Sequence, residues 1–364
     1  MHDGHSRPLF SFPSFPSFPS FPSFPSSPAA SRGRGPARLV AAVTALSALL
    51  LTAGCGSSGT AADSPEPGAS AAKGFPVTID NCGVTTTYTE PPSRAVTIHQ
   101  HPAELMLSLG LKDRMAGTSY PDSAVLPALR EDFASIPQLS KQAPSFEKVL
   151  DTDPDFVYGG YASAFAEKEG RSRKAFRDAG IDTYLNRENC AGKKGVTMRD
   201  TYAEIRTIGR IFGVSDRASA LVSELRTRVD KASAAVKDAR DVSVFVYDSG
   251  DKSAFTAGGK GLGNELIDLA GGRNVFSDLD DVFGDVSWEQ VVDRKPDVIA
   301  IYDYAGTTVA QKKRFLLSQP ALADVPAIRN KRFVVLPLTD TLVGVRSADA
   351  VRDLARGLHP ESFK

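Results

Sequence analysis

Short runs of Val, Ile, Phe and Tyr alternate with segments of helical periodicity between residues 75 and 364. The runs show little alternation with polar residues, which is typical of strands that are covered on both faces. Helical segments between such strands predict an α/β fold with parallel-rich sheets. The predicted strands are Ala95–Ile98, Phe156–Tyr158, Thr183–Leu185, Val242–Tyr247, Val298–Tyr302 and Phe333–Leu336.

Two segments of the chain repeat each other. SFEKVLDTDPDFV at 145–157 and SWEQVVDRKPDVI at 287–299 share a Ser, a Glu, a Val, an Asp and a Pro-Asp pair. In each, the Ser can cap a short helix, the Glu lies in its first turn, and the Pro ends it before a strand. A weaker echo, AELMLSLG at 103–110 and NELIDLAGG at 264–272, ends each helix with Gly. Two echoes in the same order favour a duplicated lobe, although helix–Pro-Asp–strand is also a common α/β connector.

One long helix is predicted between the halves. Residues 215–240, SDRASALVSELRTRVDKASAAVKDAR, contain neither Gly nor Pro, and Ser215 is the expected N-cap. A continuous helix is stiff, so we expect little hinge motion between the lobes. The apolar positions at helical spacing are Ala218, Leu221, Val222, Leu225, Val229, Ala232 and Val236.

The length of the body supports two lobes rather than one. Residues 75–364 are too many for a single small core. The sequence therefore predicts an α/β fold of two pseudo-symmetric lobes with parallel-rich sheets, joined by one long rigid helix. We assign 75–213 to the N-lobe, 214–240 to the linking helix and 241–364 to the C-lobe.

The front of the chain is not part of this body. Five Ser-Phe-Pro triplets at 11–25 resist helix formation, so we treat 1–31 as a low-complexity extension. Three Arg residues then precede an uncharged run from Leu39 to Leu51. A positive segment followed by a short apolar run indicates a secretory signal peptide over 32–54.

The signal ends in Thr-Ala-Gly-Cys55, which resembles a bacterial lipobox, although Thr52 holds the position where Leu is usual. The resemblance implies lipid attachment at Cys55; a plain signal peptide with a chance Cys is the alternative. Residues 55–74 are small and polar, which indicates a flexible linker. We expect a lipid-anchored protein on the extracytoplasmic face of the cell membrane.

Charge and cysteine content narrow the function further. The chain has 43 basic and 43 acidic side chains, and loss of residues 1–54 leaves it slightly acidic. This charge balance gives no basis for nucleic-acid binding. We also expect the protein to be a monomer. With Cys55 acylated, Cys82 and Cys190 remain in an oxidising compartment. An even pair suggests one disulfide, and two buried free thiols are the alternative.

Enzymatic signatures are missing from the sequence. AGGKGLG at 257–263 superficially resembles a phosphate-binding loop, but no Ser or Thr follows Lys260. The loop also begins about ten residues after its strand, whereas a dinucleotide fingerprint follows its strand tightly. No Ser-His-Asp, HExxH or CxxC arrangement occurs. We therefore expect neither an enzyme nor a resident cofactor.

Six segments occur in a characteristic order: 94–120, 144–160, the linking helix, 257–276, 286–303 and 354–360. Their order resembles the iron-siderophore/vitamin B12 class of periplasmic binding proteins, the capture subunits of ABC importers. The resemblance implies an ABC permease dimer with its ATPase as partner. It also implies one surface Glu per lobe that pairs with Arg residues of the permease, and Glu147 and Glu289 match those positions. The alternative is that each Glu only favours its helix N-terminus.

In open parallel sheets, ligands bind beyond the carboxyl ends of the strands. An aromatic set with few polar groups lies there, which suits a bulky metal chelate such as a ferric siderophore or a cobamide. Several of its Tyr rings could instead pack against loops. A bare-metal site would need three or four ligands. His99 and His101 have only His359 as a further His after the signal peptide, so no metal site is predicted. Contact with haem iron through one His and one Tyr stays open. The expected ligand-binding residues are His99, Gln100, His101, Tyr120, Tyr161, Tyr247, Asp248, Phe255, Tyr302 and Arg346.

Overall fold

We describe the protein from a computed structural model, which places residues 74–364 except 191, 193 and 305. These residues belong to one compact unit. The predicted extension, the signal peptide, Cys55 and all but the last residue of the predicted linker lie outside the described residues. Within the described part, no helix is both long enough and apolar enough to span a bilayer.

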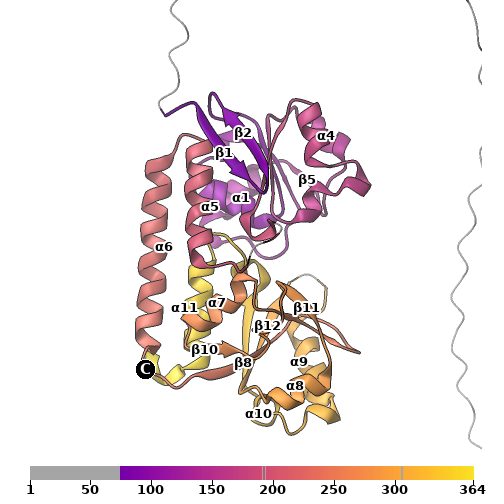
Figure 1. The fold of residues 1–364 in the computed structure, drawn as a ribbon, viewed down its shortest axis with the longest axis vertical. Helices are drawn as coiled ribbons and strands as arrows, with labels where there is room; N and C mark the ends of the chain where they lie inside the picture. The colour runs from indigo at the N-terminus through magenta and orange to yellow at the C-terminus, as the bar shows by residue number, and fades with distance from the viewer. Residues whose placement is uncertain (1–73, 191, 193, 305) are drawn as a thin grey trace, which may run out of the picture. The chain divides into compact units, whose positions relative to one another are not determined.

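The N-terminal lobe is built on a five-stranded parallel sheet in the order β5-β4-β3-β6-β7, preceded by an antiparallel hairpin (Figure 1). The hairpin strands are β1 (Val77–Asn81) and β2 (Val84–Tyr88), and the sheet strands are β3 (Ala95–Ile98), β4 (Met115–Ser119), β5 (Gln138–Ser140), β6 (Phe156–Gly159) and β7 (Asp182–Leu185). The helices are α1 (Gln100–Ser108), α2 (Arg130–Ser135), α3 (Phe146–Leu150), α4 (Arg173–Asp178) and α5 (Met198–Ile211).

The C-terminal lobe contains a four-stranded parallel sheet in the order β10-β8-β12-β13 and a separate antiparallel pair. The sheet strands are β8 (Val242–Tyr247), β10 (Gly272–Asn274), β12 (Val298–Asp303) and β13 (Phe333–Pro337), and the pair is β9 (Ala254–Ala257) with β11 (Phe283–Val286). The helices are α7 (Leu262–Leu269), α8 (Trp288–Arg294), α9 (Val309–Ser318), α10 (Pro326–Arg329) and α11 (Ser347–Leu358).

The six predicted strands are all present and differ by at most one residue at one end. The predicted α/β class with two parallel-rich sheets is confirmed. The two sheets have the same order around their first strand. β3 lies between β4 and β6 in the N-terminal lobe, and β8 lies between β10 and β12 in the C-terminal lobe. β6 and β12 are the strands in which the two repeated segments end. The sequence echoes therefore occupy equivalent places, with α3 leading into β6 and α8 into β12.

The repeated Ser residues begin equivalent helices. The Ser145 hydroxyl accepts the Lys148 backbone N–H at 3.2 Å, and the Ser287 hydroxyl accepts that of Gln290 at 3.3 Å. Each hydroxyl satisfies one of the backbone donors that a helix start leaves unpaired. The two copies therefore start α3 and α8 by the same interaction.

The repeated Asp of each Pro-Asp pair fixes the start of the neighbouring strand. The Asp155 carboxylate accepts the backbone N–H of Ser93 at 2.6 Å and its hydroxyl at 2.7 Å, just before β3. The Asp297 carboxylate accepts the same two groups of Ser243 in β8, at 3.2 Å and 2.9 Å. The second repeated residue thus also has one role in both lobes.

The predicted linking helix is α6 (Ser215–Val236), which packs against α5 of the N-terminal lobe and α11 of the C-terminal lobe (Figure 1). Ser215 was expected to be the N-cap, but it is the first residue of the helix. The N-cap is Val214, which makes no side-chain hydrogen bond to the helix start. The helix also ends at Val236 instead of residue 240. The predicted face is buried except for Leu221, which is partly exposed; the buried residues are Ala218, Val222, Leu225, Val229, Ala232 and Val236.

A disulfide joins Cys82 to Cys190 across 108 positions of sequence. Cys82 lies in the turn of the β1–β2 hairpin, and Cys190 follows the short 3-10 helix η5 (Arg187–Asn189). In the chain-entropy model, a closed loop of about 100 residues contributes up to about 4.7 kcal/mol of stability. The bond thus ties the first hairpin to the segment that follows β7 and η5.

An ion group joins the lobes directly. The Arg346 guanidinium, at the start of α11, forms two hydrogen bonds with the Glu104 carboxylate of α1. It also donates to Asp340 at 3.2 Å and to the Ala124 carbonyl at 2.8 Å. The side chains of Arg346 and Glu104 are 7% and 1% exposed, so this contact is shielded from solvent.

A second set of polar contacts also joins the lobes. Glu188 of η5 accepts the backbone N–H groups of Leu262 and Val343 of the C-terminal lobe, both at 3.0 Å. The Asn186 amide donates to the Val343 carbonyl at 2.9 Å. The lobes are therefore connected by buried polar contacts as well as by α6.

We expect Arg346→Met to lower the free energy of unfolding by about 3–5 kcal/mol, because it leaves the buried Glu104 carboxylate without its cation. Arg352→Met is the matched control in α11, since Arg352 is half-exposed and pairs with the partly exposed Asp349 and Asp353. Its loss should cost no more than about 1 kcal/mol. Urea unfolding followed by circular dichroism measures both. Equal losses for the two variants would contradict the importance of the interlobe ion group.

Candidate functional site

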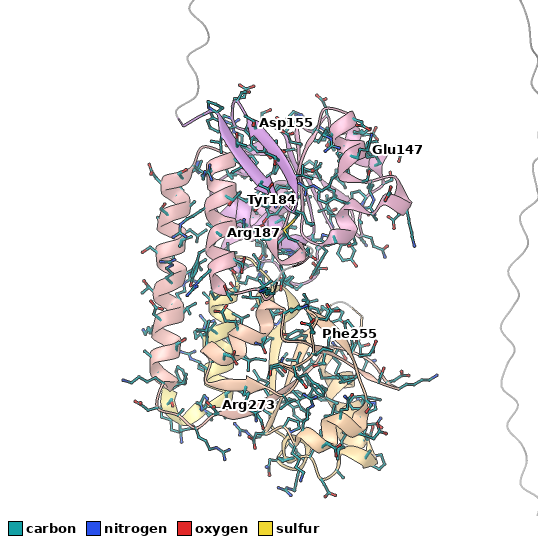
Figure 2. The ribbon with its side chains drawn as sticks, viewed as in Figure 1. Glu147, Asp155, Tyr184, Arg187, Phe255 and Arg273 are labelled. Atoms are coloured by element: carbon teal, nitrogen blue, oxygen red, sulfur yellow. A yellow bond between two sulfur atoms is a disulfide. The ribbon has the colours of Figure 1, made fainter. Side chains whose placement is uncertain are left out.

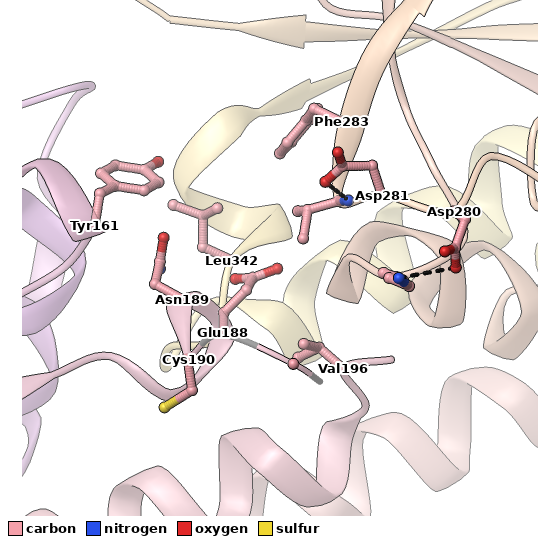
Figure 3. Close-up of a pocket in the computed structure, with 12 residues that line it drawn as sticks. Tyr161, Glu188, Asn189, Cys190, Val196, Asp280, Asp281, Phe283 and Leu342 are labelled. Carbon is pink, nitrogen blue, oxygen red and sulfur yellow. Dashed lines mark hydrogen bonds and ion pairs between the residues drawn. The ribbon is translucent and has the colours of Figure 1, made fainter. Parts of the chain in front are cut away.

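A cleft runs between the two lobes and consists of two adjoining cavities of about 540 Å³ and 530 Å³. Tyr161 of the N-terminal lobe and Phe283 of the C-terminal lobe line both cavities. Figure 3 shows Tyr161 on one side of the first cavity and Phe283 with Asp281 on the other. A bulky solute in this space would touch both lobes.

The N-terminal wall is an aromatic group that begins where β3 ends. The His99 ring lies 5.0 Å from the Tyr120 ring and 4.7 Å from the Tyr161 ring, measured between centroids. His99 and Tyr120 have φ of 84° and 56°, a backbone region that side chains rarely adopt. Such strain is concentrated at functional sites, so it supports a role for this wall.

The two imidazoles near this wall are neutral at physiological pH. Burial lowers the pKa of His99 to about 4, with a further contribution from the nearby Arg171. Burial and the adjacent His99 lower the pKa of His101 to about 3. The Nδ1 atom of His99 is buried and makes no hydrogen bond of good geometry.

The C-terminal wall follows the ends of β8 and β12. The Tyr304 hydroxyl donates to the Asp248 carboxylate. Lys312 of α9 is buried, and its ammonium donates to the carbonyls of Asp248 and Tyr302 at the ends of these strands. It also lies 4.3 Å from the centre of the Tyr304 ring. Lys312 therefore holds both strand ends and one aromatic side chain in place.

Phe255 and Phe283 complete the C-terminal wall. Their rings stack with centroids 5.7 Å apart, on the antiparallel pair β9 and β11. Phe255 lies at the edge of the C-terminal lobe that faces the N-terminal lobe (Figure 2). The two rings give this wall an apolar face.

The structure places five of the expected ligand-binding residues on the cleft and five away from it. His99, Tyr120, Tyr161, Asp248 and Phe255 line the cleft, although no ligand contact is present to test their role.

Gln100 and His101 do not line the cleft, contrary to expectation. Gln100 is buried, and its amide oxygen accepts the backbone N–H groups of Asp122 and Ser123 at 3.0 Å and 2.9 Å. His101 is buried and contacts the Gly160 carbonyl at 3.2 Å. Both residues start α1 and therefore point into the lobe to support the wall from behind.

Tyr247, Tyr302 and Arg346 also lie away from the cleft lining. Tyr247 is in the lobe core and donates to the Gly250 carbonyl at 2.7 Å, and Tyr302 is 1% exposed. Strand geometry explains the error, because side chains before the end of a buried strand face the core. Arg346 was expected to pair with an anionic ligand. In the structure its guanidinium binds Glu104 and Asp340 in the interlobe ion group.

Many residues that line the two cavities were not in the expected set, and Tyr304, Phe283 and Arg171 are three of them. Tyr304 lies directly after the end of β12, two positions beyond Tyr302. A prediction that ended the strand at Asp303 would have assigned Tyr304 to the cleft. Phe283 belongs to β11, which the hydrophobic pattern did not reveal. Arg171 lies in the loop before α4, where no periodic signal exists.

Glu147 and Glu289 lie at equivalent, fully exposed positions in the first turns of α3 and α8. Figure 2 shows Glu147 at the outer side of the N-terminal lobe. Hydrogen bonds from its own backbone and from Ser145 lower the pKa of Glu147, and those from Ser287 and its own backbone lower that of Glu289. Each lobe therefore presents one ionised carboxylate at an equivalent place.

The described residues contain no group of three or more His, Cys, Asp or Glu side chains arranged to hold a metal ion. The cleft offers instead aromatic faces, neutral nitrogen and hydroxyl groups, and carboxylates. Such a lining can bind a large organic molecule on several sides.

Comparison with known proteins identifies related chains. The family model described as periplasmic binding protein matches residues 96–338. A cobalamin-binding protein of Halobacterium salinarum is 28% identical over 272 residues, which cover 74% of this chain and 69% of the relative.

Two solved structures share the fold. A periplasmic binding protein from Veillonella parvula has a TM-score of 0.72 at 28% identity and covers 78% of this chain and 97% of its own. An ABC-type Fe3+-hydroxamate transport system protein from Saccharomonospora viridis has a TM-score of 0.67 at 27% identity, with coverage of 79% and 99%. Since the family model matches more than half of the chain, this protein belongs to the periplasmic binding protein family.

Proposed function

We propose that this protein is a lipid-anchored extracytoplasmic receptor that binds a metal chelate, a ferric siderophore or a cobamide, between its lobes. The chelate is then delivered to an ABC permease dimer with its ATPase. The observation that carries this proposal is the cleft itself, which two lobes line with aromatic rings and a few polar groups. Family membership supports a binding role without catalysis.

The size and chemistry of the cleft support a chelate as the ligand. Ligand pockets typically enclose about 300–1,000 Å³, and each of the two adjoining cavities falls in that range. Tyr161, Phe255 and Phe283 offer flat apolar faces to a large ring system or a folded chelate. The relatives named for cobalamin and for Fe3+-hydroxamate support the two chelate classes.

Haem is a second candidate because of the N-terminal wall. His99 is neutral and its ring lies 5.0 Å from that of Tyr120 in the cleft lining, and neutral imidazole and phenol oxygen are both ligands of haem iron. A visible absorption spectrum separates haem from a corrinoid or a ferric siderophore.

The two exposed carboxylates support delivery to a two-fold partner. Glu147 and Glu289 occupy equivalent positions, so a monomer presents the same group twice to a permease dimer. Exposed charges at the rim of an interface mainly steer and orient docking.

The membrane attachment rests on the signal peptide of residues 32–54, on Cys55 and on the linker of residues 55–74. Lipidation at Cys55 would fix the receptor to the membrane, and the linker would let it reach the permease. A single acyl chain binds membranes only weakly, so stable anchoring requires more than one.

The binding role is tested by purification from the native host, with mass spectrometry and a visible absorption spectrum of any compound that copurifies. We expect a metal chelate that raises the melting temperature on re-addition and is recovered unchanged. A chemically converted product would contradict a receptor.

We expect Glu147→Ala with Glu289→Ala to leave chelate affinity unchanged, because both side chains lie outside the cleft, and to reduce uptake into cells. Asp216→Ala with Asp230→Ala, at exposed positions of α6, is the matched control and should retain uptake. Radiolabelled chelate uptake measures both. Normal uptake by the Glu147/Glu289 variant would exclude the docking role.

Cys55→Ala should release the protein from membranes, because the acyl chains are then missing. Fractionation of cells followed by immunoblotting measures the distribution. Continued tight membrane association would refute the anchor.

A further inference from the structure

The loop of residues 120–126, between β4 and the 3-10 helix η2 (Pro127–Leu129), carries one side chain of the cleft lining. That side chain belongs to Tyr120, whose backbone N–H donates to the Ser140 carbonyl of β5 at 3.1 Å. Residues 121–126 form neither a strand nor a helix, so their backbone polar groups need other partners. Those partners determine where the loop holds Tyr120.

Gln100 supplies both an acceptor and a donor to this loop from one buried amide. Its side-chain oxygen accepts the backbone N–H groups of Asp122 and Ser123 at 3.0 Å and 2.9 Å. Its side-chain nitrogen donates to the Glu104 carboxylate at 2.9 Å and to the Ala124 carbonyl at 3.4 Å. Gln100 is 0% exposed, so water does not replace these bonds when they are lost. An amide of this length is the side chain that can accept and donate in this way at once.

The Glu104 carboxylate joins the loop to the C-terminal lobe. The oxygen that accepts the Gln100 amide also accepts the Leu126 backbone N–H at 3.2 Å and the Arg346 guanidinium. Arg346 reaches the loop directly as well, since it donates to the Ala124 carbonyl at 2.8 Å. The Ala124 carbonyl therefore accepts one hydrogen bond from each lobe.

A further contact between the lobes ends on the same loop. The hydroxyl oxygens of Ser123 and Thr339 lie 2.9 Å apart, and Thr339 is 1% exposed. Thr339 belongs to the 3-10 helix η7 (Leu338–Thr341), and Leu338 lines the same cavity as Tyr120. The loop is thus bonded to α1 on one side and to the C-terminal lobe on the other.

We propose that Gln100 is a positioning residue of the receptor, through which the interlobe ion group sets the place of Tyr120 in the cleft. Gln100, Glu104 and Arg346 act as one hydrogen-bonded unit on the loop of residues 120–126. Loss of Gln100 or Arg346 leaves backbone groups of the loop without partners, so the N-terminal wall loses its position while the lobe stays folded. This inference rests on the proposed receptor function and adds a residue that acts on ligand affinity without touching the ligand.

Backbone hydrogen exchange tests the hold on the loop without any ligand. Gln100→Met keeps the side-chain length and removes the amide, so we expect residues 120–126 to exchange at least about tenfold faster, with β3 and β6 unchanged. Gln319→Met, at a half-exposed position after α9, is the matched control and should leave the loop unchanged. A loop that exchanges at the wild-type rate in Gln100→Met would overturn the inference. Equal acceleration of the loop, β3 and β6 would indicate general unfolding and would also overturn it.

A second variant tests the donor role of the amide. Gln100→Glu keeps the accepting oxygen, but the introduced carboxyl must carry a proton in order to donate to the Glu104 carboxylate. The Glu104 charge favours that proton, so we expect the loop to exchange at the wild-type rate at about pH 5 and faster at about pH 8. The Arg346 guanidinium stays charged at both pH values. Burial raises the pKa values of Asp122 and Asp340 to about 6, so each rate is compared with that of the wild type at the same pH. An equal ratio at both pH values would contradict the donor role and the inference with it.

Affinity measures the consequence for the cleft. The purified protein is titrated calorimetrically with cyanocobalamin and with ferrioxamine B, and Gln100→Met should weaken the probe that binds by about tenfold. Arg346→Met should weaken it as well, and the double variant should lose less than the product of the two single losses, because both side chains act on one loop. Losses that multiply in the double variant would show independent effects and would overturn the shared unit.

The outcomes separate the two proposals. If a probe binds equally well to the wild type and to Gln100→Met, the positioning role is overturned while the receptor function stands. If neither cyanocobalamin nor ferrioxamine B binds the wild type, the two proposed chelate classes are overturned. Hydrogen exchange of residues 120–126 still decides the positioning of the loop in that case.

Discussion

The buried polar contacts between the two lobes are the constraint on which the cleft depends. α6 packs on a helix of each lobe, and the buried Arg346 guanidinium bonds Glu104 across the junction. Glu188 adds a second junction by accepting two backbone N–H groups from the other lobe. Because buried polar groups are costly to separate, these contacts oppose opening of the cleft. The aromatic walls can therefore be positioned in advance of binding, which reduces the ordering cost of association.

The duplicated chemistry explains how one chain builds two similar walls. The same Ser begins α3 and α8, and the same Asp fixes Ser93 before β3 and Ser243 in β8. These local interactions fix the starts of α3 and α8 and of β3 and β8. Several cleft residues then follow the ends of the sheet strands. The lobes differ in what is added to this frame. The C-terminal lobe has the β9–β11 pair, which supplies Phe255 and Phe283, whereas the N-terminal lobe supplies His99 and Tyr161.

The sequence predicted most of the frame, and half of the residues that it assigned to the ligand line the cleft. Buried parallel strands and the Gly-free helix α6 have strong local patterns, so their bounds were nearly correct. β9, β10 and β11 are short or partly exposed, so their patterns were too weak to read. The direction of a side chain at a strand end changes with each residue along the strand. An error of one residue in the end of β12 therefore assigned Tyr302, which is buried, to the cleft in place of Tyr304. The role of Arg346 depends on its contact with Glu104, 242 positions away, which no local pattern encodes.

The distance between the lobes tests the central claim most directly. Spin labels at the exposed positions Asp178 of α4 and Asp324 before α10, in the Cys55→Ala protein, report that distance by pulsed electron paramagnetic resonance. We predict one narrow population without ligand, and a shift of less than about 2 Å on adding a chelate that binds. Two populations without ligand, or a larger shift on binding, would show a hinge and would contradict a preformed cleft.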